Sequence, residues 1–182
     1  MKSGKWFILI ALLIIAFGCS SQLAAFENAS DVQMIFWEIQ SWEAGGGRSR
    51  LTIWANGKSE VMVVPDAYFR QGSKKFHLRD GWVMKKSQEG IYFLRTNVFS
   101  GKVAKDKFNQ ALAAGIHLLK TFRPNYVDGG GTLVGVQIKG ELKETVIPMF
   151  LDQHTGSANH QRFIAVSKVL SDFDRQAYDI QE

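Results

Sequence analysis

The segment RSRLTIWANGKSEVMVV, residues 48–64, carries the clearest secondary-structure signal of the chain. Two runs rich in β-branched residues flank the pair Asn56-Gly57. An Asn-Gly pair supplies the positive φ values that a type I′ turn requires, and this turn matches the right-handed twist of the adjoining strands. The segment therefore predicts a β-hairpin with a type I′ turn. Pro65 ends the second strand because proline has no backbone N–H to donate to a ladder.

Strand patterns continue on both sides of this hairpin. Residues 33–42 (QMIFWEIQSW) are mostly apolar at odd and even positions alike, which predicts an interior strand of the sheet. Residues 76–86 (FHLRDGWVMKK) predict a second hairpin that turns at Asp80-Gly81. Further strands are expected at residues 91–99, 132–139 and 142–151.

Two segments have helical periodicity instead. Between residues 103 and 121, apolar or small residues recur at spacings of three and four, and Pro124 follows the segment. A second helix near the C-terminus has Ser157 or Asn159 as a suitable N-cap. Its apolar face is formed by Phe163, Val166, Leu170 and Phe173. Strands and helices segregated in this way predict an α+β fold, an antiparallel β-sheet with two helices packed on one face, as a two-layer sandwich.

The N-terminal residues have the three regions of a signal peptide. Lys2 and Lys5 precede an apolar run at residues 6–17, which is too short to span a bilayer permanently. The small residues of Ala16-Phe17-Gly18 end this run, and Cys19, the only cysteine of the chain, follows directly. This arrangement resembles the lipobox of bacterial lipoprotein precursors, in which a Leu-like residue, a small residue and then Gly or Ala precede an obligatory cysteine. Here Ala16 stands at the Leu-like position and Phe17 at the small position.

The resemblance covers residues 1–21 and implies where the protein resides. Residues 1–18 are then a cleaved signal peptide, Cys19 carries acyl chains such as palmitate, and residues 19–31 form a lipid-anchored tether to a single domain at 32–182. Ser20 and Ser21 imply transfer to the periplasmic face of the outer membrane. Because Ala16-x-Gly18 also suits the ordinary signal peptidase, a soluble periplasmic protein is the alternative.

Composition restricts the function of the mature domain. Lys2 and Lys5 are the only charges before Cys19, so cleavage lowers the formal net charge from +5 to +3 and leaves 164 residues. This charge is not typical of a nucleic-acid-binding protein. No cysteine remains to form a disulfide, so packing alone must hold the domain together. No cofactor-binding motif is found, and no cofactor is expected.

Basic residues gather in the first half of the domain. Residues 48–86 hold nine Lys or Arg and three acids, a local net charge of +6. Arg48 and Arg50 follow a glycine triplet whose backbone N–H groups could form an anion-binding concavity. The predicted partner-binding or anion-binding residues are Arg48, Arg50, Lys74, Lys75 and Arg79. The alternative is a solvated sheet edge on which the cations discourage strand pairing.

Residues 152–160 contain the weak candidates for metal binding and hydrolysis. Asp152, His154 and His160 could ligate zinc, but no H-E-x-x-H motif accompanies them, so no metal is expected. Ser157 adds a nucleophile type to the same short segment, although a catalytic triad normally assembles from separate elements. His117 is expected to be a packed or half-exposed histidine beside the first helix.

These features predict a non-enzymatic module that is held at the membrane and engages another envelope protein. An immunity-type inhibitor of a toxic effector and an accessory lipoprotein of envelope assembly or secretion both fit. An envelope hydrolase that uses the Asp152, His154 and His160 region is the alternative. The many aromatic residues, including Trp37, Trp54 and Trp82, are expected to fill the sheet core, or else to line a binding face.

Overall fold

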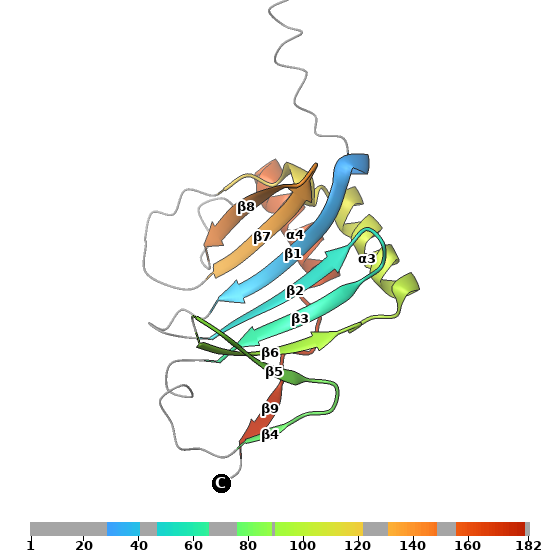
Figure 1. Ribbon diagram of the computed structural model, residues 1–182. Coiled ribbons are helices and arrows are strands. Elements are labelled where there is room, and N and C mark those ends of the chain that lie inside the picture. Colours follow the sequence, from blue (N-terminus) through green and yellow to red (C-terminus); the bar gives the residue numbers. More distant parts are fainter. Residues whose placement is uncertain are drawn as a thin grey trace, which may run out of the picture. The chain divides into compact units, whose positions relative to one another are not determined.

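Seven antiparallel strands form the main sheet of the protein, whose computed structural model describes residues 29–40, 47–65, 76–88, 90–121, 131–148 and 156–180. Residues Asp31–Glu182 form one compact unit. The sheet has the order β5-β6-β3-β2-β1-β7-β8 (Figure 1). Its strands are β1 (Val32–Gln40), β2 (Arg48–Trp54), β3 (Ser59–Val64), β5 (Val83–Ser87), β6 (Gly90–Thr96), β7 (Gly131–Ile138) and β8 (Glu141–Pro148). The short 3-10 helix η1 (Ala29–Asp31) precedes β1.

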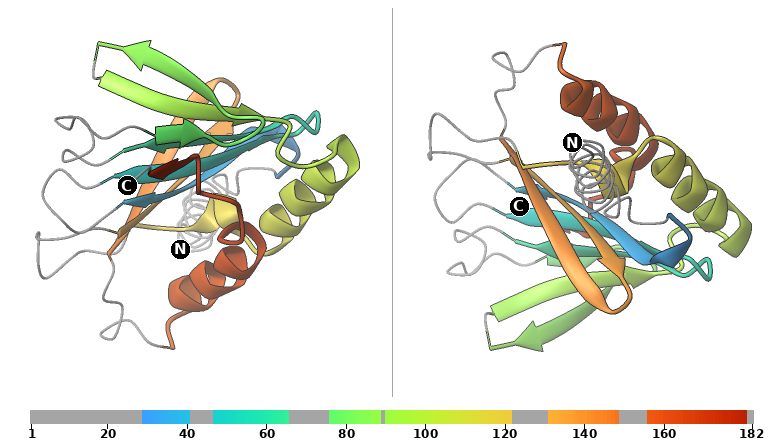
Figure 2. Two further views of the ribbon diagram at one scale, coloured as in Figure 1. Left: turned by 90° about the horizontal axis from the view of Figure 1, so that it is seen from below. Right: turned by 90° about the horizontal axis from the view of Figure 1, so that it is seen from above.

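Two helices pack on one side of this sheet, which confirms the predicted α+β fold (Figure 2). They are α3 (Gly101–Ala113) and α4 (Ala158–Leu170). Ser157 is the N-cap of α4 as expected, since its Oγ accepts a hydrogen bond from the His160 N–H at 3.1 Å. Asn159 binds instead to the backbone of Lys120, donating from Nδ2 to its carbonyl at 2.7 Å and accepting from its N–H at 3.0 Å.

The first helix is shorter than the sequence predicts. It ends at Ala113, and Gly115 then takes a left-handed conformation with φ of 85°. The 3-10 helix η2 (Ile116–Leu118) continues the segment. Ile116 and Leu119 are nevertheless buried. The row of apolar residues with helical spacing therefore continues beyond the end of α3. Glycine permits this break because it has no Cβ to clash in the left-handed region.

The predicted hairpin at residues 48–64 forms as β2 and β3, but its turn differs from the predicted type I′. Only Gly57 has a positive φ (89°), while Ala55 and Asn56 form the centre of a turn closed by the Gly57 N–H and the Trp54 carbonyl at 2.9 Å. A Cβ on Gly57 would lie 2.7 Å from the Gly101 carbonyl oxygen. The loop therefore packs tightly on the first residue of α3.

The prediction of a second hairpin at residues 76–86 is wrong. Residues 80–81 do turn, and Gly81 has φ of 82°. The strands on either side do not pair with each other, because β4 (Phe76–Leu78) pairs with the C-terminal β9 (Tyr178–Ile180) while β5 pairs with β6. The turn thus connects two sheets.

The core lies between the sheet and the helices. Ile35 and Trp37 of β1 point into it together with Leu51 and Ile53 of β2, and all four are at most 2% exposed. The Trp37 ring stacks on Phe163 of α4, with ring centroids 5.4 Å apart. Among the described residues, no helix has the length and apolar character needed to cross a membrane.

Candidate functional site on the uncovered face

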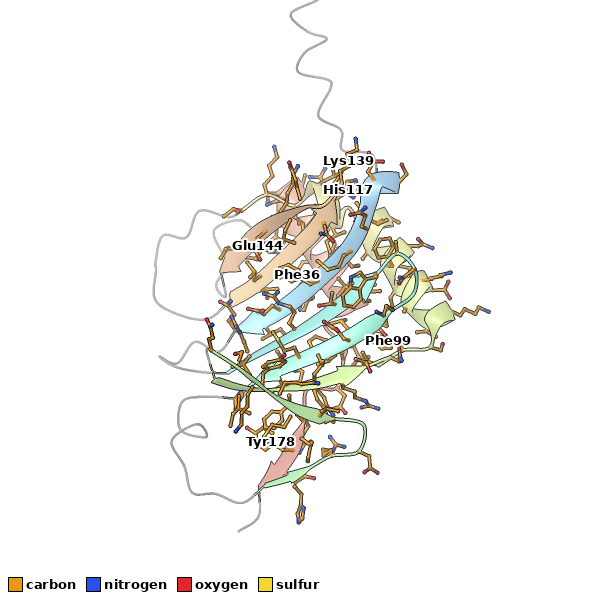
Figure 3. All side chains as sticks on the ribbon, viewed as in Figure 1. Phe36, Phe99, His117, Lys139, Glu144 and Tyr178 are labelled. Carbon is orange, nitrogen blue, oxygen red and sulfur yellow. The ribbon has the colours of Figure 1, made fainter. Side chains whose placement is uncertain are left out.

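The two faces of the main sheet have different surroundings. Side chains alternate between faces along each strand, so Trp37 and its like-facing neighbours pack on the helices. Phe36 and Glu38 therefore point to the other side. Figure 2 shows no helix of the described chain on that side, and Figure 3 shows it turned toward the viewer, with Phe36 labelled over the middle strands. We call this side the uncovered face.

One row of side chains crosses the uncovered face through all seven strands. Each member is the registered partner of the next, from edge strand β8 to edge strand β5. This central row consists of Val146, Leu133, Glu38, Arg50, Met62, Leu94 and Val83. Its two ends are apolar and open to solvent, since Val146 is 50% and Val83 52% exposed. Its middle is an ion pair.

Glu38 and Arg50 form this ion pair across β1 and β2. The Arg50 Nε donates to Glu38 Oε2 at 2.6 Å, and the Gln40 Nε2 donates to Oε1 at 2.7 Å, so both carboxylate oxygens are engaged. The Glu38 side chain has no exposed surface, whereas that of Arg50 is 26% exposed. A buried carboxylate needs such partners, because an isolated charge out of water is very costly.

Phe36 is buried although it lies on the uncovered face. The guanidinium carbon of Arg50 lies 4.2 Å from the centre of the Phe36 ring, a cation–π contact. On its other side the ring lies over Gly135 of β7, where an added Cβ would come within 2.0 Å of a ring carbon. Gly135 therefore leaves room for the Phe36 ring, and Phe36 in turn helps to fix the position of Arg50.

Opposite charges lie on either side of the central row. The next row on the same face, two positions along each strand, contains Phe36. In this row β8 carries Glu144 and β3 carries Glu60. On the other side β2 carries Arg48 and β5 carries Lys85. Figure 3 shows Glu144 on the same side of the sheet as Phe36. The uncovered face therefore has an apolar and ionic centre with an acidic flank and a basic flank.

The acidic flank includes a carboxyl group with an altered proton affinity. Burial raises the pKa of Glu60 above its ordinary value, and the nearby Lys58 ammonium partly opposes this increase. Glu60 therefore takes up a proton more readily than an exposed glutamate does.

The structure divides the basic residues predicted to bind a partner or anion. Arg48 and Arg50 lie two residues apart on β2 and on the same face, but the Arg50 guanidinium is paired with Glu38. Arg79 lies elsewhere, after β4, where it faces Asp174 at 3.5 Å. Lys74 and Lys75 lie outside the described residues, as does most of the glycine triplet before Arg48.

The predicted metal and hydrolase segment is only partly described. Asp152 and His154 lie outside the described residues, so the hydrolase alternative stays a prediction. His160 lies in the first turn of α4, where its Nδ1 is buried without a partner in the described part of the chain. Ser157 serves as a helix cap there. Within the described ranges, no group of three His, Cys, Asp or Glu residues could hold a metal ion.

His117 is half-buried, in agreement with the sequence. Burial lowers the pKa of its imidazole, and the positive charge of Arg162 lowers it further.

The tryptophans were expected to fill the sheet core or to line a binding face, and they differ in how far they are buried. Trp37 and Trp82 are buried at 2% and 5% exposure, whereas Trp54 is half-buried at the end of β2.

Sequence reasoning missed Glu38 and the central row. The signal was a single acid inside the apolar run MIFWEI, where a charge is tolerated only with a partner. The partner could not be named, because strand register decides which residue lies opposite. No protein-family model matches the chain, and no significant match to a curated protein was found.

Proposed function

We propose that this protein is a lipid-anchored binding module of a bacterial envelope, which docks another protein on its uncovered face. The central row is the observation that carries the docking part of the proposal. It exposes Val146 and Val83 at its ends, and Leu142, which lies on the same face of β8 four residues before Val146, is 49% exposed. Exposed apolar side chains on a face rimmed by charges are typical of protein-binding surfaces.

The edges of the sheet are less suited to binding than its face. Edge strand β5 carries Lys85 and Lys86, and edge strand β8 carries Glu141, Lys143 and Glu144. Charged side chains on edge strands discourage the pairing of a further strand. We therefore place the partner across the strands, over the central row.

The charges of the uncovered face specify the chemistry of the partner surface. Its centre should be apolar, to cover the ends of the central row. It should carry a basic group opposite Glu144 and Glu60, and an acidic group opposite Lys85. Such a bipolar arrangement favours one orientation of the partner, because the reverse orientation brings like charges together.

The anchor rests on Cys19 at the end of the apolar leader. Two or more acyl chains hold a protein stably on a membrane, whereas one chain binds marginally. An immunity-type inhibitor and an accessory factor of envelope assembly or secretion both fit a module of this kind. Each would use the anchor to stay where its partner acts.

Site-specific photo-crosslinking tests the docking face. A photoreactive amino acid is placed at Val146 or Val83 in the full-length protein in cells, and at Ile164 of α4 as the control. Ile164 is a matched control because it is apolar and 40% exposed on the helix side. We expect one discrete protein adduct at both row positions and none at Ile164. An equal adduct at Ile164, or none at the two row positions, would overturn the proposed face.

A further inference from the structure

A cavity of about 360 Å³ lies on the helix side of the sheet, apart from the uncovered face. It is lined by Leu78, Arg79, Asp80, Trp82, Arg95 and Asp174. Arg95 follows Leu94 in β6, so its side chain points away from the central row. The cavity therefore belongs to a second surface region, where the turn after β4 meets the segment between α4 and β9.

Two arginines converge on one carboxylate in this cavity. Asp174 lies 3.5 Å from the Arg79 Nη1 through Oδ1 and 3.3 Å from the Arg95 Nη1 through Oδ2. All three side chains are open to solvent, with exposures between 35% and 41%. Both contacts are longer than the 2.7–2.9 Å of a strong charge-assisted hydrogen bond. Asp174 therefore holds the two cations only weakly.

Trp82 supplies a hydrogen-bond donor that has no acceptor among the described residues. Its side chain is buried, at 5% exposure, and its indole Nε1 is buried without a partner. A buried N–H without an acceptor costs free energy in the protein alone. The Trp82 residue also lines the cavity, so its indole N–H signal can report on a group that binds there.

We propose that this cavity binds the carboxylate of a peptide or protein ligand, with Asp174 as the intramolecular group that it displaces. Arg79 and Arg95 provide the positive charge, and Leu78 and the Trp82 indole provide apolar contact. A carboxylate has two oxygens with several lone pairs, so it can accept from both guanidinium groups, as Asp174 does. The site is independent of the partner proposed for the uncovered face.

The charge balance of the cavity sets the expected effect of substitutions. Arg79 and Arg95 are matched by Asp80 and Asp174, so a ligand carboxylate must compete with Asp174. Asp174→Asn removes that competition yet keeps an Oδ1 acceptor for the Gln176 N–H, which donates to it at 3.0 Å. One unit charge at such a distance near solvent changes an affinity about fivefold or more.

The test uses NMR titration of the full chain without its leader, following the indole N–H signal that Trp82→Phe removes. Three probes separate the carboxylate sources: acetyl-triglycine with a free C-terminus, acetyl-Gly-Glu-Gly-amide, and acetyl-triglycine-amide as the probe without a carboxylate. We expect the Trp82 signal to move with one or both carboxylate probes and not with the amide. Asp174→Asn should tighten binding about fivefold or more, and Arg95→Gln should weaken it by a similar factor.

Arg175→Gln is the matched control, because Arg175 is an exposed arginine next to Asp174 that does not line the cavity. The affinity of this variant should stay within about twofold of the parent, because the Arg175 side chain is exposed and does not line the cavity, and a charge surrounded by water interacts only weakly. The proposal is overturned if the parent and Asp174→Asn, both folded, leave the Trp82 signal unmoved. It is also overturned if the amide binds as well as the acids, or if Arg175→Gln and Arg95→Gln lose affinity equally.

Discussion

Replacing Arg50 by Met removes the charge that compensates Glu38 and keeps most of the side chain that covers Phe36. Glu38 has no exposed surface, and its only cationic partner among the described residues is Arg50, at 2.6 Å. The substitution leaves a buried carboxylate whose described partner is the Gln40 amide alone. We therefore expect Arg50→Met to cause a large loss of folding stability, although Arg50 itself is partly exposed.

The magnitude follows from the burial of the two partners. Removing one member of a buried ion pair costs roughly 3–5 kcal/mol, because the other charge is left uncompensated. The 26% exposure of Arg50 places this pair at the lower end, so we expect the free energy of unfolding to fall by about 3 kcal/mol. The double variant Glu38→Leu with Arg50→Met removes both charges and should stay within about 1 kcal/mol of the parent.

Urea denaturation followed by tryptophan fluorescence measures both values. The double-mutant cycle also includes Glu38→Leu alone, and the coupling energy between the two positions should be about 2–3 kcal/mol. Arg175→Gln, which removes an exposed arginine, should change stability by less than about 0.5 kcal/mol. A loss below about 1 kcal/mol for Arg50→Met, or a double variant no more stable than that single one, would refute the reasoning.

Three further predictions concern packing, pH and the anchor. Gly135→Ala should cost about 1–3 kcal/mol, because its Cβ would meet the Phe36 ring, and Phe36→Leu should recover part of this loss in the same urea assay. Since burial and Arg162 lower the pKa of His117 in the folded protein, stability should fall as the pH drops below about 6.5, and His117→Gln should reduce that fall in thermal melts. An equal fall in the variant would contradict this assignment. Radiolabelled palmitate should enter the parent protein and not Cys19→Ser, and equal labelling of both would exclude the anchor at this residue.

Local signals were sufficient for much of the fold. The two β-rich runs around Asn56-Gly57 predicted the β2–β3 hairpin, because its two strands are adjacent in sequence. The turn type was not predictable, since the packing of Gly57 against Gly101 at the start of α3 is a contact between distant residues. The early end of α3 has a similar cause. Gly115 packs against the Arg162 side chain of α4, and the helical spacing of apolar residues gives no information about this contact between distant residues.

Long-range pairing limited the prediction of the rest. A three-residue strand such as Tyr178–Ile180 has too few residues for a pattern, and its partner Phe76–Leu78 lies about a hundred positions earlier. The candidate site depends on the same kind of information. Arg50 was predicted from its charge, but its role became clear only when the register placed it opposite Glu38. Arg79 was predicted with it but lines the cavity on the helix side, apart from the uncovered face.

The most direct test of the docking face is the binding affinity between this protein and the partner that the photo-crosslinking experiment identifies. Val146→Asp and Ile164→Asp place the same new charge at two apolar positions of similar exposure, 50% on the central row and 40% on α4. Isothermal titration should show about tenfold weaker binding or more for Val146→Asp, and a change within about twofold for Ile164→Asp. Equal affinity of the two variants, or a greater loss for Ile164→Asp, would contradict docking on the uncovered face.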